Sequence, residues 1–268
     1  MQVKGKVVVV TGGGNGIGRA VVLELLRRGA KVAAVDLREE GLAETAVLAA
    51  AGDRLSTHAV DVTDRDAVGQ LPDLVTQAHG RFDGLVNVAG VIQKFIPFSE
   101  LSYPEMERVV SVNLWGVVNT CHAFLPGLLK RPQASIVNVS SMGGLAPVPG
   151  QTMYGASKTA VKLFSEGLYG EMQGTNVAVT TVFPGGVATG IAENSGAGRP
   201  GQAERAGEAT SKLTTAASAA SQIVDGIENG AFRVMVGNDA KMVDRLSRLA
   251  PRKAVETIAS KMKSLTAH

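Results

Sequence analysis

The chain has 268 residues, of which 45% are hydrophobic and 32 are glycine, so it is long enough to bury one large core. Its 27 basic and 24 acidic residues leave a net charge of +3 and are scattered singly, so nucleic acid is not expected as a partner. The single cysteine excludes an internal disulfide framework, and the four histidines lack the spacing of metal ligands. No run approaches the roughly 18 apolar residues of a membrane span, and the region after Met1 does not resemble a signal peptide. We therefore expect a cytoplasmic protein with no membrane partner and no metal.

Short runs rich in β-branched residues alternate with longer segments of helical period along the chain. Seven runs are expected to be strands, at residues 6–10, 31–35, 55–60, 84–88, 135–139, 177–183 and 233–236. Helical patterns fill the intervals, at residues 17–28, 40–51, 65–79, 104–129, 153–172 and 216–229. The alternation predicts an α/β fold: one doubly wound, Rossmann-type domain with seven parallel strands and helices on both faces.

Composition divides this domain into a core and two further segments. The core is expected at about residues 5–237. Within it, residues 189–212 are rich in Gly, Ala and charge, which is typical of a mobile lid over a ligand, although a plain loop has the same composition. Residues 238–268 are expected to form two helices split at Pro251, and their positive excess fits a solvated helical face better than a binding patch. The helix at 104–129 is expected to begin with a capping box formed by Ser102 and Glu105.

The first predicted strand ends in a glycine-rich turn, Thr11-Gly12-Gly13-Gly14-Asn15-Gly16-Ile17-Gly18, which leads directly into a helix. A Cβ atom there would keep the backbone from approaching a pyrophosphate, whose charge suits the N–H groups and positive dipole of a helix N-terminus. Such a turn alone is a weak signal, but its strand-turn-helix context strengthens it. The residues expected to bind a dinucleotide here are Gly12, Asn15, Gly16, Ile17 and Gly18.

Asp36 ends the second predicted strand, about twenty residues after the glycine turn. A carboxylate at this position accepts hydrogen bonds from the adenosine ribose hydroxyls and repels a 2′-phosphate. We therefore expect NAD(H) as the preferred cofactor and NADP(H) as the less favoured one. Arg38 leaves the second alternative open, because a guanidinium two residues further on can turn toward a phosphate.

Other small or polar residues follow the third and fourth predicted strands. Because the carboxyl ends of parallel strands share one edge of the sheet, they are expected to border the same crevice. The residues expected beside the cofactor are Asp61, Val62, Asn87, Ala89 and Gly90.

Tyr154 and Lys158 are four residues apart in a helical pattern and therefore lie on one face, a turn apart. A free phenol titrates near pH 10, so a nearby ammonium and the charge of an oxidised nicotinamide are needed to make it a useful base near neutrality. Ser141 ends the fifth predicted strand, thirteen residues before the tyrosine, where its hydroxyl can polarise a substrate oxygen. Asn113, in the middle of a predicted helix, is a candidate for anchoring a water beside the lysine.

Taken in order, these motifs resemble those of the NAD(P)(H)-dependent short-chain dehydrogenase/reductase family, over about residues 5–236. The motifs are TGGGNGIG, Asp36, Asp61-Val62, NVAG, Asn113, the spacing from Ser141 to Tyr154, YGASK and Pro184-Gly185-Gly186-Val187-Ala188-Thr189. The NVAG motif departs from the family's commoner NNAG by one side-chain amide.

The resemblance implies a catalytic tetrad and further cofactor contacts. The tetrad consists of Asn113, Ser141, Tyr154 and Lys158. Lys158 is also implied to bond the nicotinamide ribose, and Tyr154 lies beside the cofactor. The remaining implied cofactor contacts come from Pro184, Gly185, Val187 and Thr189. The family also implies a homo-oligomer, a tetramer or a dimer, and an apolar seam or the subunit core would each use Trp115, Val118, Phe124, Phe164 and Leu168.

The expected function is hydride transfer between NAD(H) and a small-molecule substrate, an uncharged and mainly apolar secondary alcohol or ketone. The substrate contacts are assigned to Ser141, Gly143, Gln151 and Tyr154, with Gln151 alternatively a solvent-facing loop amide. Further lining is expected from Val91, Ile92, Gln93, Phe95, Met142, Val148, Gly185 and Ile191. Two alternatives are an epimerase or dehydratase that retains its NAD, and a non-catalytic NAD(H)-binding regulator.

Overall fold

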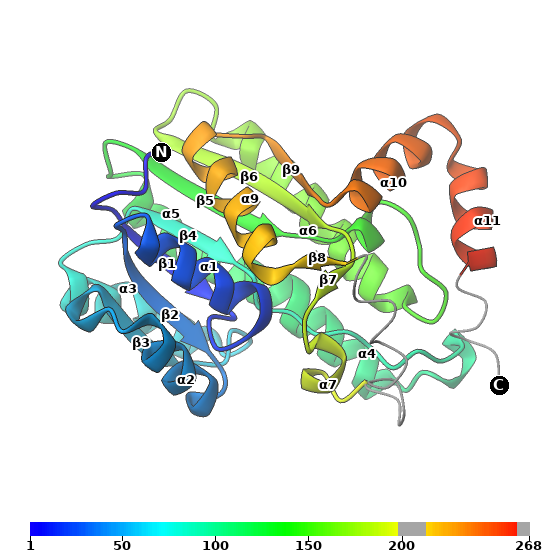
Figure 1. Cartoon of the computed structure of the whole chain (residues 1–268), viewed down its shortest axis with the longest axis horizontal. Coiled ribbons are helices and arrows are strands. Elements are labelled where there is room, and N and C mark those ends of the chain that lie inside the picture. The colour runs from blue at the N-terminus through cyan, green and yellow to red at the C-terminus, as the bar shows by residue number, and fades with distance from the viewer. Residues whose placement is uncertain (198–212, 262–268) are drawn as a thin grey trace.

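Seven parallel strands form the central sheet of the protein, seen in a computed structural model that describes residues 1–197 and 213–261 (Figure 1). The strands are β1 (Val7–Thr11), β2 (Lys31–Asp36), β3 (Leu55–Ala59), β4 (Gly84–Asn87), β5 (Ala134–Val139), β6 (Val177–Pro184) and β9 (Arg233–Val236). Their order, β3-β2-β1-β4-β5-β6-β9, reverses direction between β1 and β4, as in a doubly wound sheet. The predicted fold class and all seven strands are confirmed, with bounds that differ by at most one residue at either end.

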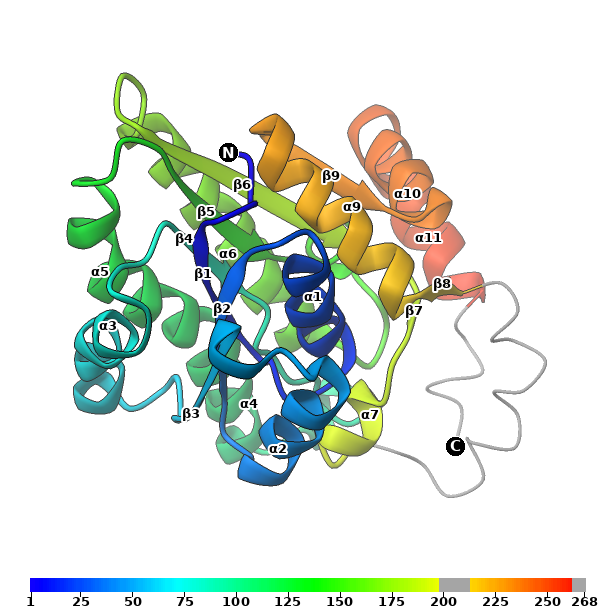
Figure 2. The same cartoon turned by 60° about the vertical axis from the view of Figure 1, so that its left-hand side comes forward.

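Helices cover both faces of the sheet (Figure 2). They are α1 (Gly16–Arg27), α2 (Glu39–Ala49), α3 (Arg65–His79), α4 (Tyr103–Val110), α5 (Gly116–Leu128), α6 (Thr152–Glu171), α7 (Ile191–Asn194), α9 (Ala216–Asn229), α10 (Asn238–Leu249) and α11 (Pro251–Lys261). Side chains alternate along β1, so that Val8 and Val10 pack with α1 and α9 while Val7 and Val9 pack with α3, α5 and α6. Two apolar cores therefore lie on opposite faces of one sheet.

The single helix predicted at 104–129 is interrupted by a π-helical turn, η3 (Ser111–Trp115), between α4 and α5. Ser102 is the N-cap of α4, but its side chain makes no capping hydrogen bond. Glu105 instead accepts a hydrogen bond from the Lys94 backbone N–H at 2.6 Å. The predicted capping box is therefore wrong, because the loop after β4 offers Glu105 a different donor.

Two parts of the chain after β6 lie outside the seven-stranded sheet: the segment that follows β6 and the C-terminal helices. A short second sheet pairs β7 (Val187–Ala188) with β8 (Thr214–Thr215). The first part of the predicted lid includes α7. The rest of the predicted lid, residues 198–212, lies outside the described residues. Beyond β9, α10 and α11 form a helical pair at the end of the molecule (Figure 1). Within residues 1–197 and 213–261, no helix combines the length and apolar character needed to cross a membrane.

A buried polar chain joins the two central strands to the helices behind them. Asn87 on β4 donates to Asn138 on β5 at 2.9 Å, and Thr120 on α5 donates to Asn87 at 2.8 Å. Asn138 in turn donates to Ser165 on α6 at 3.0 Å. All four side chains are buried, so these bonds satisfy polar atoms that the core would otherwise leave without partners. Asn87 was expected beside the cofactor, and its side chain makes these hydrogen bonds within the core instead.

At the amino-terminal ends of the central strands, one carboxylate is completely buried. Asp83 accepts hydrogen bonds from the Val7 backbone N–H at 3.0 Å, from Arg81 at 3.0 Å and from Arg131 at 2.9 Å. The two guanidinium groups and the backbone donor compensate for the loss of hydration. This cluster ties the start of β1 to the loops before β4 and β5.

The aromatic and aliphatic residues that suited either an interface or the core differ in their burial. Phe124 and Leu168 are buried in the subunit core, where Phe124 packs edge-to-face on Phe82. Phe164 is packed against the same core. Trp115 is exposed and lies under the guanidinium of Arg65.

Candidate active site

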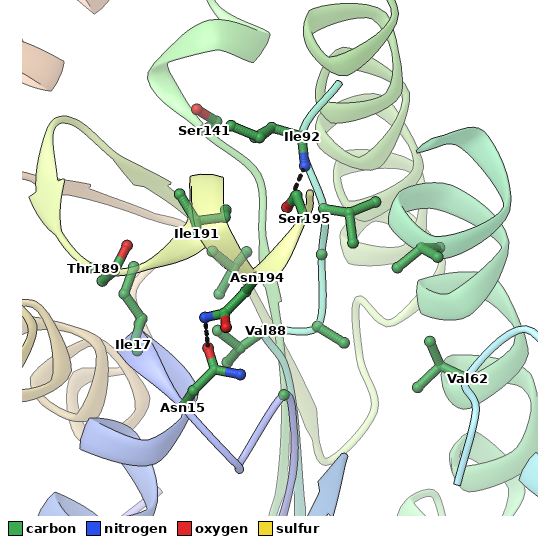
Figure 3. A pocket seen from close by; sticks show the side chains of 18 of the residues that line it. Asn15, Ile17, Val62, Val88, Ile92, Ser141, Thr189, Ile191, Asn194 and Ser195 are labelled. Carbon is green, nitrogen blue, oxygen red and sulfur yellow. Dashed lines mark hydrogen bonds between the residues drawn. The ribbon is translucent and has the colours of Figure 1, made fainter. Parts of the chain in front are cut away.

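A cavity of about 760 Å³ lies at the carboxyl ends of the strands. Many of the residues predicted for the cofactor or the chemistry line it: Gly12, Asn15, Gly16, Ile17, Gly18, Asp36, Asp61, Val62, Ala89, Gly90, Ser141, Tyr154, Lys158, Pro184, Gly185, Val187 and Thr189. Segments far apart in the sequence thus meet at the carboxyl ends of β1 and β4, the neighbouring strands between which the strand order reverses (Figure 3). Asn87, Asn113, Gly143 and Gln151 are not among the lining residues.

The backbone of the glycine turn is packed too closely against neighbouring backbone to accept side chains at two of its positions. Gly12 has a φ of +70°, and a Cβ atom on it would lie 2.9 Å from the backbone nitrogen of Ala89. A Cβ atom on Gly18 would overlap the carbonyl oxygen of Gly12. The first turn of α1 contains no acidic residue to oppose the positive end of its dipole. This backbone therefore fits a phosphate group.

Asp36 closes the cavity at the end of β2. One carboxylate oxygen accepts a hydrogen bond from the Gly14 N–H at 2.9 Å, and the other accepts one from the Arg38 N–H at 3.1 Å. The Arg38 guanidinium donates to the side chain of Asn194 on α7 at 2.9 Å. The carboxylate is thus fixed beside the glycine turn, while the cation two residues further on is engaged by α7.

Tyr154 and Lys158 project from the first turns of α6 toward the cavity, and Ser141 faces them from the end of β5. The lysine is only 4% exposed and donates to the carbonyl oxygen of Val139 at 3.0 Å. Burial lowers the pKa of Lys158 to about 8. Burial also raises the pKa of Tyr154, and a hydrogen bond with Ser141 opposes that rise. Without a cofactor, the phenol is therefore held in its neutral form.

Asn113 lies in the π-helical turn and is completely buried. Its amide oxygen accepts from the Val91 N–H at 2.8 Å, and its amide nitrogen donates to the Val91 carbonyl at 2.9 Å and to Ser157 at 3.0 Å. Gly90 separates the amide from Lys158, because a Cβ atom on it would lie within 3.2 Å of both side chains. Asn113 therefore holds the loop after β4 against α6.

The buried side chains of Gln93 and Gln151 form hydrogen bonds around the start of α6. The Gln93 side-chain oxygen accepts from the backbone N–H groups of Met153 at 2.8 Å and Tyr154 at 3.1 Å, and its nitrogen donates to Gly150. Gln151 donates to the backbone carbonyl of Gln93 at 2.7 Å. Gln151 is thus buried at the N-cap of α6. The sequence suggested either a substrate contact or a solvent-facing amide, but Gln151 neither lines the cavity nor faces solvent.

Only some of the residues that were expected to line the substrate site line the cavity. Val91, Ile92, Gly185 and Ile191 line the cavity, while Gln93, Phe95, Met142 and Val148 are not among its lining residues. Gly143 donates its N–H to the Ser141 hydroxyl at 3.0 Å and so supports the site from behind.

The helix α7 lies across the mouth of the cavity (Figure 3). Asn194 donates to the side chain of Asn15 in the glycine turn at 3.3 Å. On the other wall, the Ile92 N–H donates to Ser195 at 3.0 Å, and Arg108 donates to the Ser195 carbonyl at 3.2 Å. This short helix therefore bridges the two sides of the crevice.

Comparison with known proteins identifies the family. Residues 6–200 match the short chain dehydrogenase family. The chain belongs to that family. SadH of Mycobacterium tuberculosis, named as an oxidoreductase, is 39% identical over 252 residues, which cover 92% of this chain and 91% of SadH. The chain is accordingly an oxidoreductase of the short-chain dehydrogenase family.

Two solved structures of short-chain dehydrogenases share the fold. One, from Burkholderia phymatum in complex with NAD, has a TM-score of 0.84 and 28% identity and covers 95% of this chain and 97% of its own. The other, from Burkholderia cenocepacia J2315 in complex with NADP, has a TM-score of 0.78 and 25% identity and covers 98% of this chain and 99% of its own. Similar structures thus bind either dinucleotide.

Several residues that build this site were not predicted as parts of it. Thr11 accepts hydrogen bonds from the N–H groups of Val88 and Ala89 at 3.1 and 3.2 Å and so joins β1 to the loop after β4. Arg108 lines the cavity but was not among the residues expected there. Thr11 was recognisable as the polar end of an apolar strand, whereas Arg108 is one of several charges on an amphipathic helix and carries no local signal.

Proposed function

We propose that the chain transfers a hydride between NAD(H) and an uncharged secondary alcohol or ketone, with Tyr154 as the proton-transferring residue. One observation carries this proposal: Ser141, Tyr154 and Lys158 meet on the same cavity that the glycine turn lines. The cradle at Gly12 and Gly18 suits the pyrophosphate of a dinucleotide, whose nicotinamide would then extend toward Ser141 and Tyr154.

The chain's own residues divide the work of the reaction. Nicotinamide, when bound, supplies or accepts the hydride. The Ser141 hydroxyl holds the substrate oxygen, and Tyr154 gives its proton to that oxygen in reduction and removes it in oxidation. Since burial raises the pKa of Tyr154, the charge of Lys158 together with that of the oxidised cofactor must stabilise the phenolate. Asn113 acts on the chemistry through the loop that it holds beside the lysine.

Asp36 supports a preference for NAD(H) over NADP(H). Its two carboxylate oxygens are held by backbone N–H groups at the end of β2, where a 2′-phosphate would meet a fixed negative charge. Arg38, the nearby cation, is bonded to Asn194. We expect kcat/KM to be higher with NAD(H), and a higher value with NADP(H) would reject this part of the proposal.

The residues beside the chemistry favour an uncharged substrate. Val91, Ile92 and Ile191 are apolar lining residues. Arg108 donates to the backbone carbonyls of Ile92 and Ser195, so it is engaged with the wall and α7 rather than forming a carboxylate clamp. A panel of secondary alcohols and ketones, followed at the NADH absorbance band, would define the substrate class.

The decisive test of the mechanism is Tyr154→Phe, which removes only the phenolic oxygen. We expect kcat to fall at least about a hundredfold, because a positioned acid or base contributes on that order. Tyr169→Phe is a matched control: it lies on the same helix, and its ring packs on Phe232 with the two centroids 4.5 Å apart. Near-normal turnover of Tyr154→Phe would reject the assignment, whereas the control should retain its rate.

A further inference from the structure

The C-terminal helical pair reaches the cavity wall through one side chain. Asp239 lies in the first turn of α10, and one of its carboxylate oxygens accepts a hydrogen bond from the backbone N–H of Gly186 at 2.6 Å. The other oxygen accepts from the Ala240 N–H at 2.9 Å. A carboxylate at this end of a helix is also stabilised by the helix dipole, so the side chain is held while it contacts the distant loop.

Glycine residues leave the space that this carboxylate occupies. A Cβ atom on Gly185 would overlap the carboxylate of Asp239, and one on Gly237 would lie 2.5 Å from it. Gly237 also has a φ of +92°, which other residues rarely adopt. The carboxylate thus fits a notch made of backbone from two separate segments, the loop after β6 and the start of α10.

The loop held in this way is a wall of the candidate active site. Pro184, Gly185, Gly186 and Val187 all line the cavity. The Gly186 N–H is bonded to Asp239, and the Gly186 carbonyl accepts a hydrogen bond from the Thr214 N–H at 2.9 Å. The first bond fixes the peptide plane before Gly186, and the second fixes the plane after it. On a trans peptide the N–H points opposite to the C=O, so the bond to the Gly186 carbonyl also fixes the N–H of Val187. The orientation of the Val187 N–H is therefore set from outside the cavity.

We propose that Asp239 is a positioning residue through which the C-terminal helices hold the wall formed by residues 184–187 for the nicotinamide end of the cofactor. This inference rests on the proposed function, because it assigns that wall to a nicotinamide. The carboxylate makes no contact with the reaction itself. It acts by keeping the Gly186 peptide in the orientation that the bound dinucleotide requires, so that less ordering of the loop is needed when the dinucleotide binds.

The test compares Asp239→Ala, Asp239→Asn and Asp244→Ala in the full chain. Asp239→Ala removes the acceptor, whereas Asp239→Asn keeps an oxygen that can accept from Gly186. Asp244 lies on the same helix and pairs with Arg248 at 2.9 Å, so Asp244→Ala removes an acidic side chain from α10 without touching the loop.

Two measurements separate positioning from a general loss of structure. Hydrogen–deuterium exchange of the cofactor-free protein should show faster exchange at the Gly186 amide in Asp239→Ala, with residues 7–11 of β1 unchanged. NADH titration should show Kd raised about tenfold, the scale expected for one hydrogen bond to a charged group, with partial recovery in Asp239→Asn and none of the effect in Asp244→Ala.

The outcomes also distinguish this inference from the proposed function. If the wild type binds NADH and Asp239→Ala binds it equally well, the positioning role is wrong and the proposed function stands. Unchanged exchange at Gly186 in Asp239→Ala would likewise overturn the positioning role. If the wild type binds neither NADH nor NADPH, the proposed function fails and this inference fails with it.

Discussion

Lys158→Met should remove activity while making the cofactor-free protein more stable near neutral pH. The lysine is nearly completely buried, and its ammonium donates one hydrogen bond, to the carbonyl of Val139. Among the residues that the structure describes, no carboxylate forms an ion pair with it. A buried, unpaired charge lowers the stability of the folded chain, and the proposed catalytic role accounts for its presence.

The size and sign of the effect follow from the pKa of Lys158. Burial lowers it from 10.5 to about 8, and each pKa unit corresponds to about 1.4 kcal/mol, so the charge costs about 3 kcal/mol below pH 8. Between those two pKa values the unfolded chain binds more protons than the folded chain. The free energy of unfolding of the wild type therefore receives a contribution that rises with pH through this window, and the full penalty applies below it.

The assay is urea unfolding of the cofactor-free wild type and Lys158→Met on either side of that window. Loss of the bond to Val139 costs about 1 to 2 kcal/mol, so the variant should be more stable by about 1 to 2 kcal/mol near pH 7. The difference should change by about 3 kcal/mol toward pH 10.5, as the wild-type lysine loses its charge, so that the wild type becomes the more stable protein by about 1 to 2 kcal/mol. Lys162→Met, one turn further along α6 and partly exposed beside Glu166, should change stability little at either pH.

A stability difference between Lys158→Met and wild type that is the same at both pH values would refute the reasoning. So would a variant that is less stable than the wild type near neutrality, because the burial cost would then be absent. Activity is measured on the same preparations: kcat of Lys158→Met should fall strongly, since in the proposed mechanism the phenol loses the charge that stabilises its ionised form.

Three further predictions concern other parts of the structure. Asp83→Ala should lower the free energy of unfolding by about 3 to 5 kcal/mol in urea titrations, because it leaves Arg131 partly buried without its partner; a change below about 1 kcal/mol would show that the cluster is dispensable. Gly18→Ala should abolish NADH binding measured by fluorescence, since the new methyl group overlaps Gly12; unchanged affinity would mean that the cradle is not where the dinucleotide lies. Gln93→Leu should lower kcat at least about tenfold with little change in the Kd of NADH, because it releases the start of α6; an equal rise in Kd would instead indicate a wider disturbance.

Most of the seven strands were predictable because they are short, mainly apolar runs with a turn on either side, although β3 also contains Ser56, Thr57 and His58. Val7, Val8, Val9 and Val10 show why: parallel strands buried on both faces need continuous apolar residues, and few helices contain such runs. The alternation with helical segments then leaves the doubly wound sheet as the natural topology.

The break at Asn113 was not predictable from periodicity. An extra residue in one turn changes the phase of a helical pattern only slightly, so residues 104–129 still look like one helix. The reason for the break lies in the loop after β4, whose Val91 backbone supplies both a donor and an acceptor to the amide. Contacts of this kind join segments 22 residues apart and have no local signature.

Motif spacing predicted the side chains that converge on the cavity, but not the residues that hold them in place. Tyr154 and Lys158 belong to a compact pattern on one helix, whereas Gln93 reaches that helix from a loop 61 residues earlier than Tyr154. Gln151 was assigned to the substrate because it precedes Tyr154 by three residues. Its burial depends on the carbonyl of Gln93, which only the folded chain brings near.

The polar chain from Thr120 through Asn87 and Asn138 to Ser165 also determines which alignments of the central strands are tolerable. Asn87 and Asn138 are partners in the register of β4 and β5. A slip of one residue would turn the amide of the shifted strand to the opposite face, where Val86, Val137 and Val139 form part of the apolar core, and would leave it without a hydrogen-bond partner. Each such amide would cost about 1 to 3 kcal/mol, comparable with a large part of the net stability of a domain. These hydrogen bonds therefore favour the native register of β4 and β5, on which the cavity at their carboxyl ends depends.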